Sequence, residues 1–218
     1  ILTPKQYLFF EYFVLKLRKQ HRIVCTSRKY QQVNGIEKFG SINPIIVGKH
    51  GGKNNLNKLL ESLNRSKLLT KKIEKWSPDL LISFCSPEAS RVAFGLGIPH
   101  IAFSDSLPYV TKLLIPWIIP KEDFKEFGIN YKNIIKYRAI DAGVIIKNYK
   151  KNKQKKLNKK KIILIRPEES EAAYITKKSK TIKIIKKIVE DFPDEQKIVL
   201  SRYKDQSKNL KKIFGNNI

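Results

Sequence analysis

The chain has 218 residues, enough for one large domain or two small ones with cores that need no disulfide or metal. Its formal net charge is +26, from 45 Lys and Arg against 19 Asp and Glu. The two cysteines, Cys25 and Cys85, stand in apolar stretches, which argues against a disulfide framework and favours a cytoplasmic protein. No apolar run approaches the roughly 20 residues of a membrane span, and no charged-then-apolar leader opens the chain.

The first elements alternate between helix and strand. Thr3 followed by Pro4 is typical of a helix start, and the apolar spacing predicts a helix to about Arg18. We expect strands over 22–27 and 45–47, with a weaker helix over 30–39 between them and a long helix over 56–76 after them. The segment 80–103 repeats strand, helix and strand, with Ser86 as the helix N-cap and glycines 95 and 97 at the helix end.

A second α/β unit follows a short helix that ends at Gly128 and a basic run, Lys147–Lys161. It contains expected strands over 162–165 and 197–200 and helices over 180–192 and 205–214. Strands that alternate with helices predict parallel sheets covered on both faces. The sequence therefore predicts an α/β fold with a domain over 1–146, a linker over 147–161 and the first part of a second domain over 162–218, with a cleft between the domains.

The two ends of the chain favour a fragment. The sequence contains no Met, and it begins in the apolar pair Ile1 and Leu2. The last predicted helix stops where another strand would follow. We expect a chain truncated at both ends, without the start of its first strand.

The positive charge raises the question of a polyanionic partner. Lys is spread over nearly every predicted helix, and only the run Lys147–Lys161 is dense, with a single aromatic residue in it. A solvated linker is the favoured interpretation of this run. A non-enzymatic basic module for nucleic acid or an anionic membrane surface is the alternative, with nucleic acid the less favoured partner.

Candidate binding residues precede the first helix and follow the strand over 45–47. The stretch TPKQ contains Thr3, Lys5 and Gln6 at a helix N-terminus, where unpaired N–H groups favour anions, although plain capping explains it equally. The stretch GKHGG contains Lys49 and His50 between glycines that allow a ligand to approach the backbone, but it lacks the order of a P-loop. A flexible hinge is the alternative there.

Four further candidate residues follow predicted strands. Ser86 and Glu88 stand in the first turn of a helix, as ligand contacts or as structural caps. Asp105 is a candidate general base or hydroxyl ligand, and a turn-forming Asp is the alternative. Cys85 is expected to be a buried thiol, because no His stands beside it in the sequence.

The stretch IRPEES ends the strand over 162–165. Arg166 has a planar fork that suits a diphosphate or a carboxylate, and Pro167 stops the strand. Glu168 and Glu169 point opposite ways if extended, so one is expected to pair with Arg166 or a sugar hydroxyl. Ser170 completes the candidate set, and a purely structural Arg–Glu pair is the alternative.

Five ordered stretches together resemble a known family. ILTPKQ, VGKHGG, SFCSPEASRVAFGLGIP, PWIIP and RPEESEAAY are similar to the archaeal family called domain of unknown function 354 (DUF354), which is related to GT-B glycosyltransferases and to UDP-N-acetylglucosamine 2-epimerases. The resemblance implies two Rossmann-like domains with a nucleotide-sugar, UDP-sugar first, bound between them. It departs at Cys85, where we would expect Gly.

The residue patterns and the resemblance together give the candidate residues expected roles. Glu88, Asp105 and Glu168 are the expected catalytic carboxylates. The expected substrate-binding residues are Thr3, Lys5, Gln6, Lys49, His50, Ser86, Arg166, Glu169 and Ser170. A transferase or an epimerase is the implied enzyme class, with an unknown acceptor, no metal and no cofactor.

Overall fold

The structure is a computed structural model that describes residues 1–30, 40–103, 110–147, 161–168 and 181–215. The chain divides into two compact units, unit 1 over Ile1–Tyr149 and unit 2 over Lys150–Ile218. The division falls inside the run 147–161 that the sequence assigns to a linker. Each unit is described by itself.

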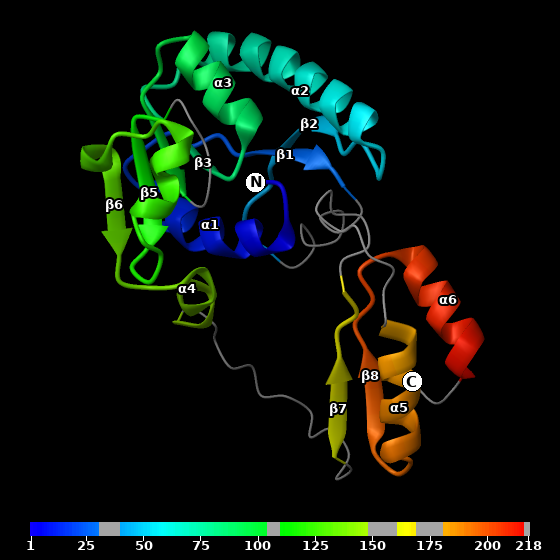
Figure 1. Cartoon of the computed structure of the whole chain (residues 1–218). Helices are drawn as coiled ribbons and strands as arrows, with labels where there is room; N and C mark the ends of the chain where they lie inside the picture. The colour runs from blue at the N-terminus through cyan, green and yellow to red at the C-terminus, as the bar shows by residue number, and fades with distance from the viewer. Residues whose placement is uncertain (31–39, 104–109, 148–160, 169–180, 216–218) are drawn as a thin grey trace. The chain divides into compact units, whose positions relative to one another are not determined.

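Unit 1 alternates helices and strands, as Figure 1 shows. Its elements in chain order are α1 (Pro4–Leu17), β1 (Thr26–Lys29), β2 (Ile45–Lys49), α2 (Asn55–Trp76), β3 (Leu81–Phe84), α3 (Pro87–Gly95), β4 (His100–Phe103), β5 (Lys112–Pro116), η2 (Glu122–Phe127), η3 (Tyr131–Asn133), β6 (Ile134–Tyr137) and α4 (Asp141–Lys147). Strands β1 and β2 pair in parallel, and β3, β4, β5 and β6 form a second, all-parallel sheet in that order.

Unit 2 has the same local pattern. It contains β7 (Ile162–Ile165), α5 (Thr181–Asp191), β8 (Gln196–Val199) and α6 (Lys204–Phe214), and its two strands pair in parallel. Ile165 and Ile185 pack with Leu210 and Phe214 in its core. The parallel sheets and covering helices confirm the predicted α/β class.

The helix caps follow the sequence. The Thr3 hydroxyl accepts a hydrogen bond from the Gln6 backbone N–H at the start of α1, and the Asn54 side chain accepts from the Asn57 N–H at the start of α2. The helix α2 ends at Ser77, which takes a left-handed conformation with φ of 45°. These predicted helix boundaries are confirmed within one or two residues.

An aromatic cluster joins α1 to the four-stranded sheet. Phe9 and Phe10 of α1 pack against Phe84 of β3 and Phe103 of β4. The Phe9 ring lies 5.2 Å from the Phe84 ring and 5.0 Å from the Phe103 ring, both edge to face. This packing fixes the start of α1 next to the carboxyl ends of β3 and β4.

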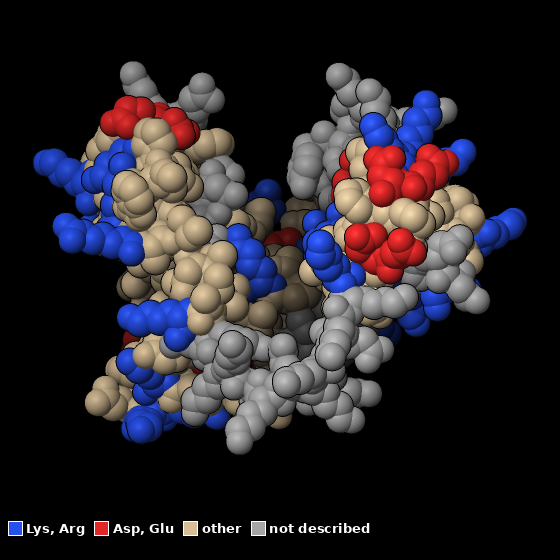
Figure 2. Space-filling model, turned by 90° about the horizontal axis from the view of Figure 1, so that it is seen from below, with Lys and Arg blue, Asp and Glu red and all other residues tan. Residues whose placement is uncertain are grey.

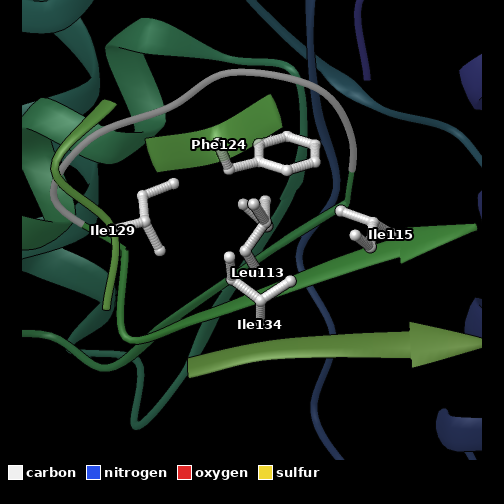
Figure 3. Packing of buried hydrophobic residues seen from close by; sticks show 6 residues of the cluster. Leu113, Ile115, Phe124, Ile129 and Ile134 are labelled. Carbon is white, nitrogen blue, oxygen red and sulfur yellow. The ribbon is translucent and has the colours of Figure 1, made fainter. Parts of the chain in front are cut away.

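A second cluster, shown in Figure 3, lies where the sequence predicts no strand. Leu113 and Ile115 of β5 and Ile134 of β6 pack against Phe124 and Ile129. Prolines 116 and 120 interrupt this apolar stretch and hide the strand pattern. Pro116 ends β5, so the missing N–H falls at the strand terminus.

Other expectations need correction. The first strand begins at Thr26 and not at 22, and the strand β6 and helix α4 were missed. The predicted short helix before Gly128 is a 3-10 helix, η2. The weak helix expected over 30–39 falls almost entirely outside the described residues. Among the described residues, no helix is long and apolar enough to cross a membrane.

Candidate functional site

The start of α1 is tied to β3 by Gln6. This side chain is buried; its oxygen accepts from the Leu2 backbone N–H at 2.6 Å and its nitrogen donates to the Phe84 carbonyl at 3.1 Å. The ammonium of Lys5 lies 5.0 Å from the centre of the Phe84 ring. Both ends of the Gln6 amide are used within the protein, so its position supports a structural role, whereas Lys5 remains at the surface.

Residues of the loop after β2 contact α2, Tyr30 and one another. Lys49 forms an ion pair with Glu61 of α2 at 3.3 Å. The His50 Nδ1 accepts from the Gly52 backbone N–H at 3.0 Å, and its ring lies 4.7 Å from that of Tyr30. A Cβ on Gly51 would lie 2.5 Å from the Asn57 carbonyl oxygen. The close approach that Gly51 allows is therefore to the first turn of α2.

Glu88 is the most enclosed carboxylate of the candidate set, with 4% of its surface exposed. Its Oε1 accepts from the Ser62 hydroxyl of α2 at 2.8 Å, and its Oε2 accepts from the Ser86 hydroxyl at 3.0 Å. The Ser86 hydroxyl also accepts from the Ala89 N–H, so Ser86 is the N-cap of α3 as predicted. Two donors and the N-terminus of a helix hold the Glu88 carboxylate in place.

Two arginines accompany Glu88. Arg65 of α2 is 2% exposed and donates to the Ser27 carbonyl of β1 at 2.9 Å and to the Val47 carbonyl of β2, so it bridges the two strands. Burial lowers the pKa of Arg65 to about 10, and the Glu88 charge opposes that shift. Burial likewise lowers the pKa of Arg28, again opposed by Glu88. The residues Ser62, Ser86, Glu88, Arg65 and Arg28 are called the Glu88 cluster.

Several buried polar atoms beside this cluster have no hydrogen-bond partner among the described residues. They are the Ser27 hydroxyl, the Nε atoms of Arg28 and Arg65, and Oε2 of Glu61. Such atoms are uncommon in native proteins, since an unpaired buried polar group is costly. The Glu88 cluster therefore has the polar capacity to bind further hydroxyl or anionic groups.

Ser83 and His100 form a separate pair on adjacent strands. The Ser83 Oγ lies 2.8 Å from the His100 Nε2, and both side chains are buried. Burial lowers the pKa of His100 to about 4, so the ring is neutral at physiological pH. Among the described residues, no carboxylate contacts His100. We therefore interpret the buried Ser83–His100 pair as a structural hydrogen bond of the core.

The Cys85 backbone explains the departure from the family pattern. Its φ is +47°, in the left-handed region that favours glycine. Its N–H donates to the Phe103 carbonyl at 3.1 Å. The expectation of Gly at this position thus has a conformational reason, and burial raises the pKa of the other thiol, Cys25.

Unit 2 has a pocket of about 500 Å³ at the carboxyl ends of its strands. Its cationic residues are Arg166, at the end of β7, and Arg202 and Lys204 around the start of α6. The remaining lining residues are Val199, Leu200, Ser201, Tyr203 and Ser207. The N-cap residue Tyr203 makes no side-chain cap, so the first N–H groups of α6 donate no hydrogen bond to a capping side chain. The pocket therefore combines three cations with a helix N-terminus.

Hydrogen bonds across unit 2 shape this pocket. The Arg202 Nε donates to the Pro167 carbonyl at 3.4 Å, and its backbone N–H donates to the Gln206 side chain at 2.8 Å. The same Gln206 side chain donates to the Glu168 carbonyl at 3.3 Å. These bonds hold the segment after β7 beside α6. Arg166 and Glu168 are exposed, which differs from a buried Arg–Glu pair.

The remaining candidates are Asp105, Glu169 and Ser170, which lie outside the described residues. Within the described part of the chain, no group of three or more His, Cys, Asp or Glu side chains is placed to hold a metal ion.

The comparisons with known proteins place this geometry in a family. The family model described as a protein of unknown function (DUF354) matches residues 3–217. The chain belongs to DUF354. No curated protein is similar to it at a significant level.

Two solved structures with a similar fold were determined with UDP-GlcNAc or with UDP. The chain is similar to the UDP-GlcNAc 2-epimerase from Neisseria meningitidis bound to UDP-GlcNAc, with a TM-score of 0.74, 16% identity, and coverage of 100% of this chain and 69% of that one. It is also similar to S. aureus MnaA solved with UDP, with a TM-score of 0.71, 14% identity, and coverage of 98% and 65%. At these identities the likeness shows the fold alone.

Sequence reasoning missed Arg28, Arg65, Arg202 and Lys204. Arg65 had a detectable signal, since it stands at i, i+4 and i+8 spacing with Leu69 and Ile73 on the buried side of α2. A charge on the apolar face of a helix needs a partner. For Arg28 and Arg202, only the fold brings the side chain to its site.

Proposed function

We propose that this DUF354 chain binds a nucleotide-sugar, with a UDP-sugar as the first candidate, and that its diphosphate occupies the pocket of unit 2. The observation that carries the proposal is the cationic pocket lined by Arg166, Arg202 and Lys204. The fold shared with proteins solved with UDP-GlcNAc and with UDP supports the ligand class.

The physical chemistry of the pocket suits a diphosphate. Guanidinium groups form paired hydrogen bonds to phosphate oxygens, and a Lys ammonium adds charge without a fixed direction. The N-terminus of α6 adds N–H donors and the positive end of the helix dipole. A volume of about 500 Å³ is within the range of small-ligand pockets. A diphosphate would thus be neutralised by the protein without a metal.

The Glu88 cluster of unit 1 is the second part of the proposal. Two serine hydroxyls hold the Glu88 carboxylate, whose charge favours the ionised forms of the buried Arg28 and Arg65, and the unpaired Nε atoms of these two arginines would bind hydroxyls of a sugar or an acceptor. Asp105 and Glu168 remain the candidate acid and base groups for a transferase or an epimerase, and Thr3, Lys5, Lys49, His50, Glu169 and Ser170 remain candidate contacts.

Calorimetry with a panel of UDP-, GDP-, TDP- and CMP-sugars tests the proposal on the chain itself. Arg166→Ala and Lys204→Ala are each expected to weaken binding by about 1–2 kcal/mol, less than for a buried ion pair because both side chains are exposed. Lys187→Ala, on the exposed side of α5, is the matched control and should leave affinity unchanged. An absence of heat with every nucleotide-sugar, or equal effects of all three variants, would overturn it.

A further inference from the structure

The turn after β5 exposes two large apolar side chains side by side. Trp117 has 57% of its surface exposed and Ile118 has 63%. Ile140, in the turn after β6, is 50% exposed. Moving a large apolar side chain out of water lowers the free energy. Adjacent exposed apolar side chains therefore mark a contact surface more often than isolated exposed side chains do.

The sheet brings these two turns together. Pro116 of β5 pairs with Tyr137 of β6 in the parallel register, and the Trp117 backbone N–H donates to the Tyr137 carbonyl at 2.9 Å. The Ile119 N–H donates to the Pro116 carbonyl and the Ala139 N–H to the Tyr137 carbonyl, which closes both turns. Trp117, Ile118 and Ile140 are called the β5–β6 tip.

Two basic residues stand next to the tip in the sequence. Arg138 belongs to the second turn and is exposed, whereas Lys121 follows the first turn and its ammonium donates to the Tyr131 carbonyl at 3.5 Å. On the face of unit 1 seen in Figure 2, Lys and Arg border a broad area of other residues, and acidic side chains gather mainly at one edge. Glu122 and Asp123, at the exposed start of η2, are the acidic residues next to Lys121 in the sequence.

We propose that the β5–β6 tip docks on the surface of an anionic lipid bilayer. An indole prefers the headgroup region, where its ring leaves water and its N–H keeps a polar partner. Ile118 and Ile140 would enter the boundary of the acyl chains, while the exposed Arg138 would meet lipid phosphates. A small apolar tip next to an exposed cation suits an anionic membrane surface. The core of a protein–protein interface, in contrast, is broader and depleted of charged residues.

Trp117 itself reports on the contact. The chain has two tryptophans, and Trp76 packs against the cluster of Val47, Leu69 and Ile73. A Trp76→Phe variant leaves Trp117 as the sole fluorophore. With vesicles that contain about 30% phosphatidylglycerol in phosphatidylcholine, its emission should shift to the blue, and cosedimentation should fall as salt is raised.

Two substitutions at equally exposed apolar residues distinguish specific binding through the tip from nonspecific hydrophobic binding to vesicles. Ile118→Ser should lower partitioning onto these vesicles about tenfold, whereas Leu56→Ser, at the same 63% exposure on α2, should leave it unchanged. Arg138→Gln should weaken binding at low salt, and Glu122→Gln with Asp123→Asn should strengthen it. Circular dichroism melting would confirm that each variant is folded.

Three results would overturn the proposal. Binding without a blue shift of Trp117 would assign the contact to another surface, such as the run 147–161. Equal effects of Ile118→Ser and Leu56→Ser would remove the tip as the site. Absence of binding to anionic vesicles, or equal binding to pure phosphatidylcholine, would exclude an anionic bilayer as the partner of the tip.

Discussion

The Ser62 hydroxyl of α2 donates a hydrogen bond to the Glu88 carboxylate of α3, with 2.8 Å between the two oxygens. The same carboxylate accepts from Ser86 and opposes the desolvation of the buried Arg65. A candidate catalytic residue thus also connects two helices and compensates a buried cation.

Removal of Glu88 should destabilise unit 1 strongly. Glu88→Ala leaves the Ser62 and Ser86 hydroxyls without their acceptor and removes the charge that favours the ionised Arg65, and we expect a loss of about 2–3 kcal/mol in the free energy of unfolding. Urea denaturation followed by circular dichroism measures it. Glu74→Gln, an exposed acid on α2, is the control and should change stability by less than about 0.5 kcal/mol. A Glu88→Ala change no larger than the control would show that Arg65 is solvated.

Acid should weaken the fold through His100. Its pKa is lowered from 6.5 to about 4, so the folded state favours the neutral ring. This stabilisation is complete above about pH 6.5 and is lost as the pH falls toward 4, a total of about 3 kcal/mol. Urea midpoints between pH 7 and pH 4 should therefore fall less steeply in His100→Asn than in the parent chain. The exposed His21→Asn variant should keep the parent slope, and identical slopes in all three chains would contradict the prediction.

Cys85 should tolerate glycine better than a branched side chain. Its φ of +47° costs a non-glycine residue about 1–2 kcal/mol, and a β-branched residue more. We expect Cys85→Gly to stay within about 1 kcal/mol of the parent and Cys85→Val to be less stable than both. Thermal melting of the three chains gives the order. A Cys85→Val chain as stable as Cys85→Gly would mean that this conformation carries no strain.

The two adjacent glycines of the loop after β2 should differ in tolerance. A Cβ on Gly51 would meet the backbone of Asn57 and Lys58 at 2.5 Å, whereas a Cβ on Gly52 meets nothing within 4 Å. Gly51→Ala should therefore cost more than about 2 kcal/mol, because the first turn of α2 must move. Gly52→Ala, at φ +72°, should cost about 1 kcal/mol from its left-handed backbone. Equal costs, read from urea denaturation, would show that the loop adjusts freely.

The sequence by itself determined the α/β class, most helix limits and the capping roles of Thr3 and Ser86, because local hydrogen bonds and apolar periodicity act over a few residues. It located Arg166, the strand end that becomes one side of the unit 2 pocket. It missed β5 and β6, where proline and short apolar runs give ambiguous local signals.

Only the tertiary structure brought Arg65 to Glu88, or Arg202 to Arg166. The first pair is 23 positions apart and the second 36, so their proximity depends on how α2 packs on β1 and β2 and how β8 pairs with β7. It also decided burial: Gln6 and Glu88 became enclosed and Arg166 stayed exposed. Burial depends on how helices and strands pack, whereas a sequence motif specifies only residue types and their spacing. Polar residues that look alike in the sequence therefore have different environments in the structure.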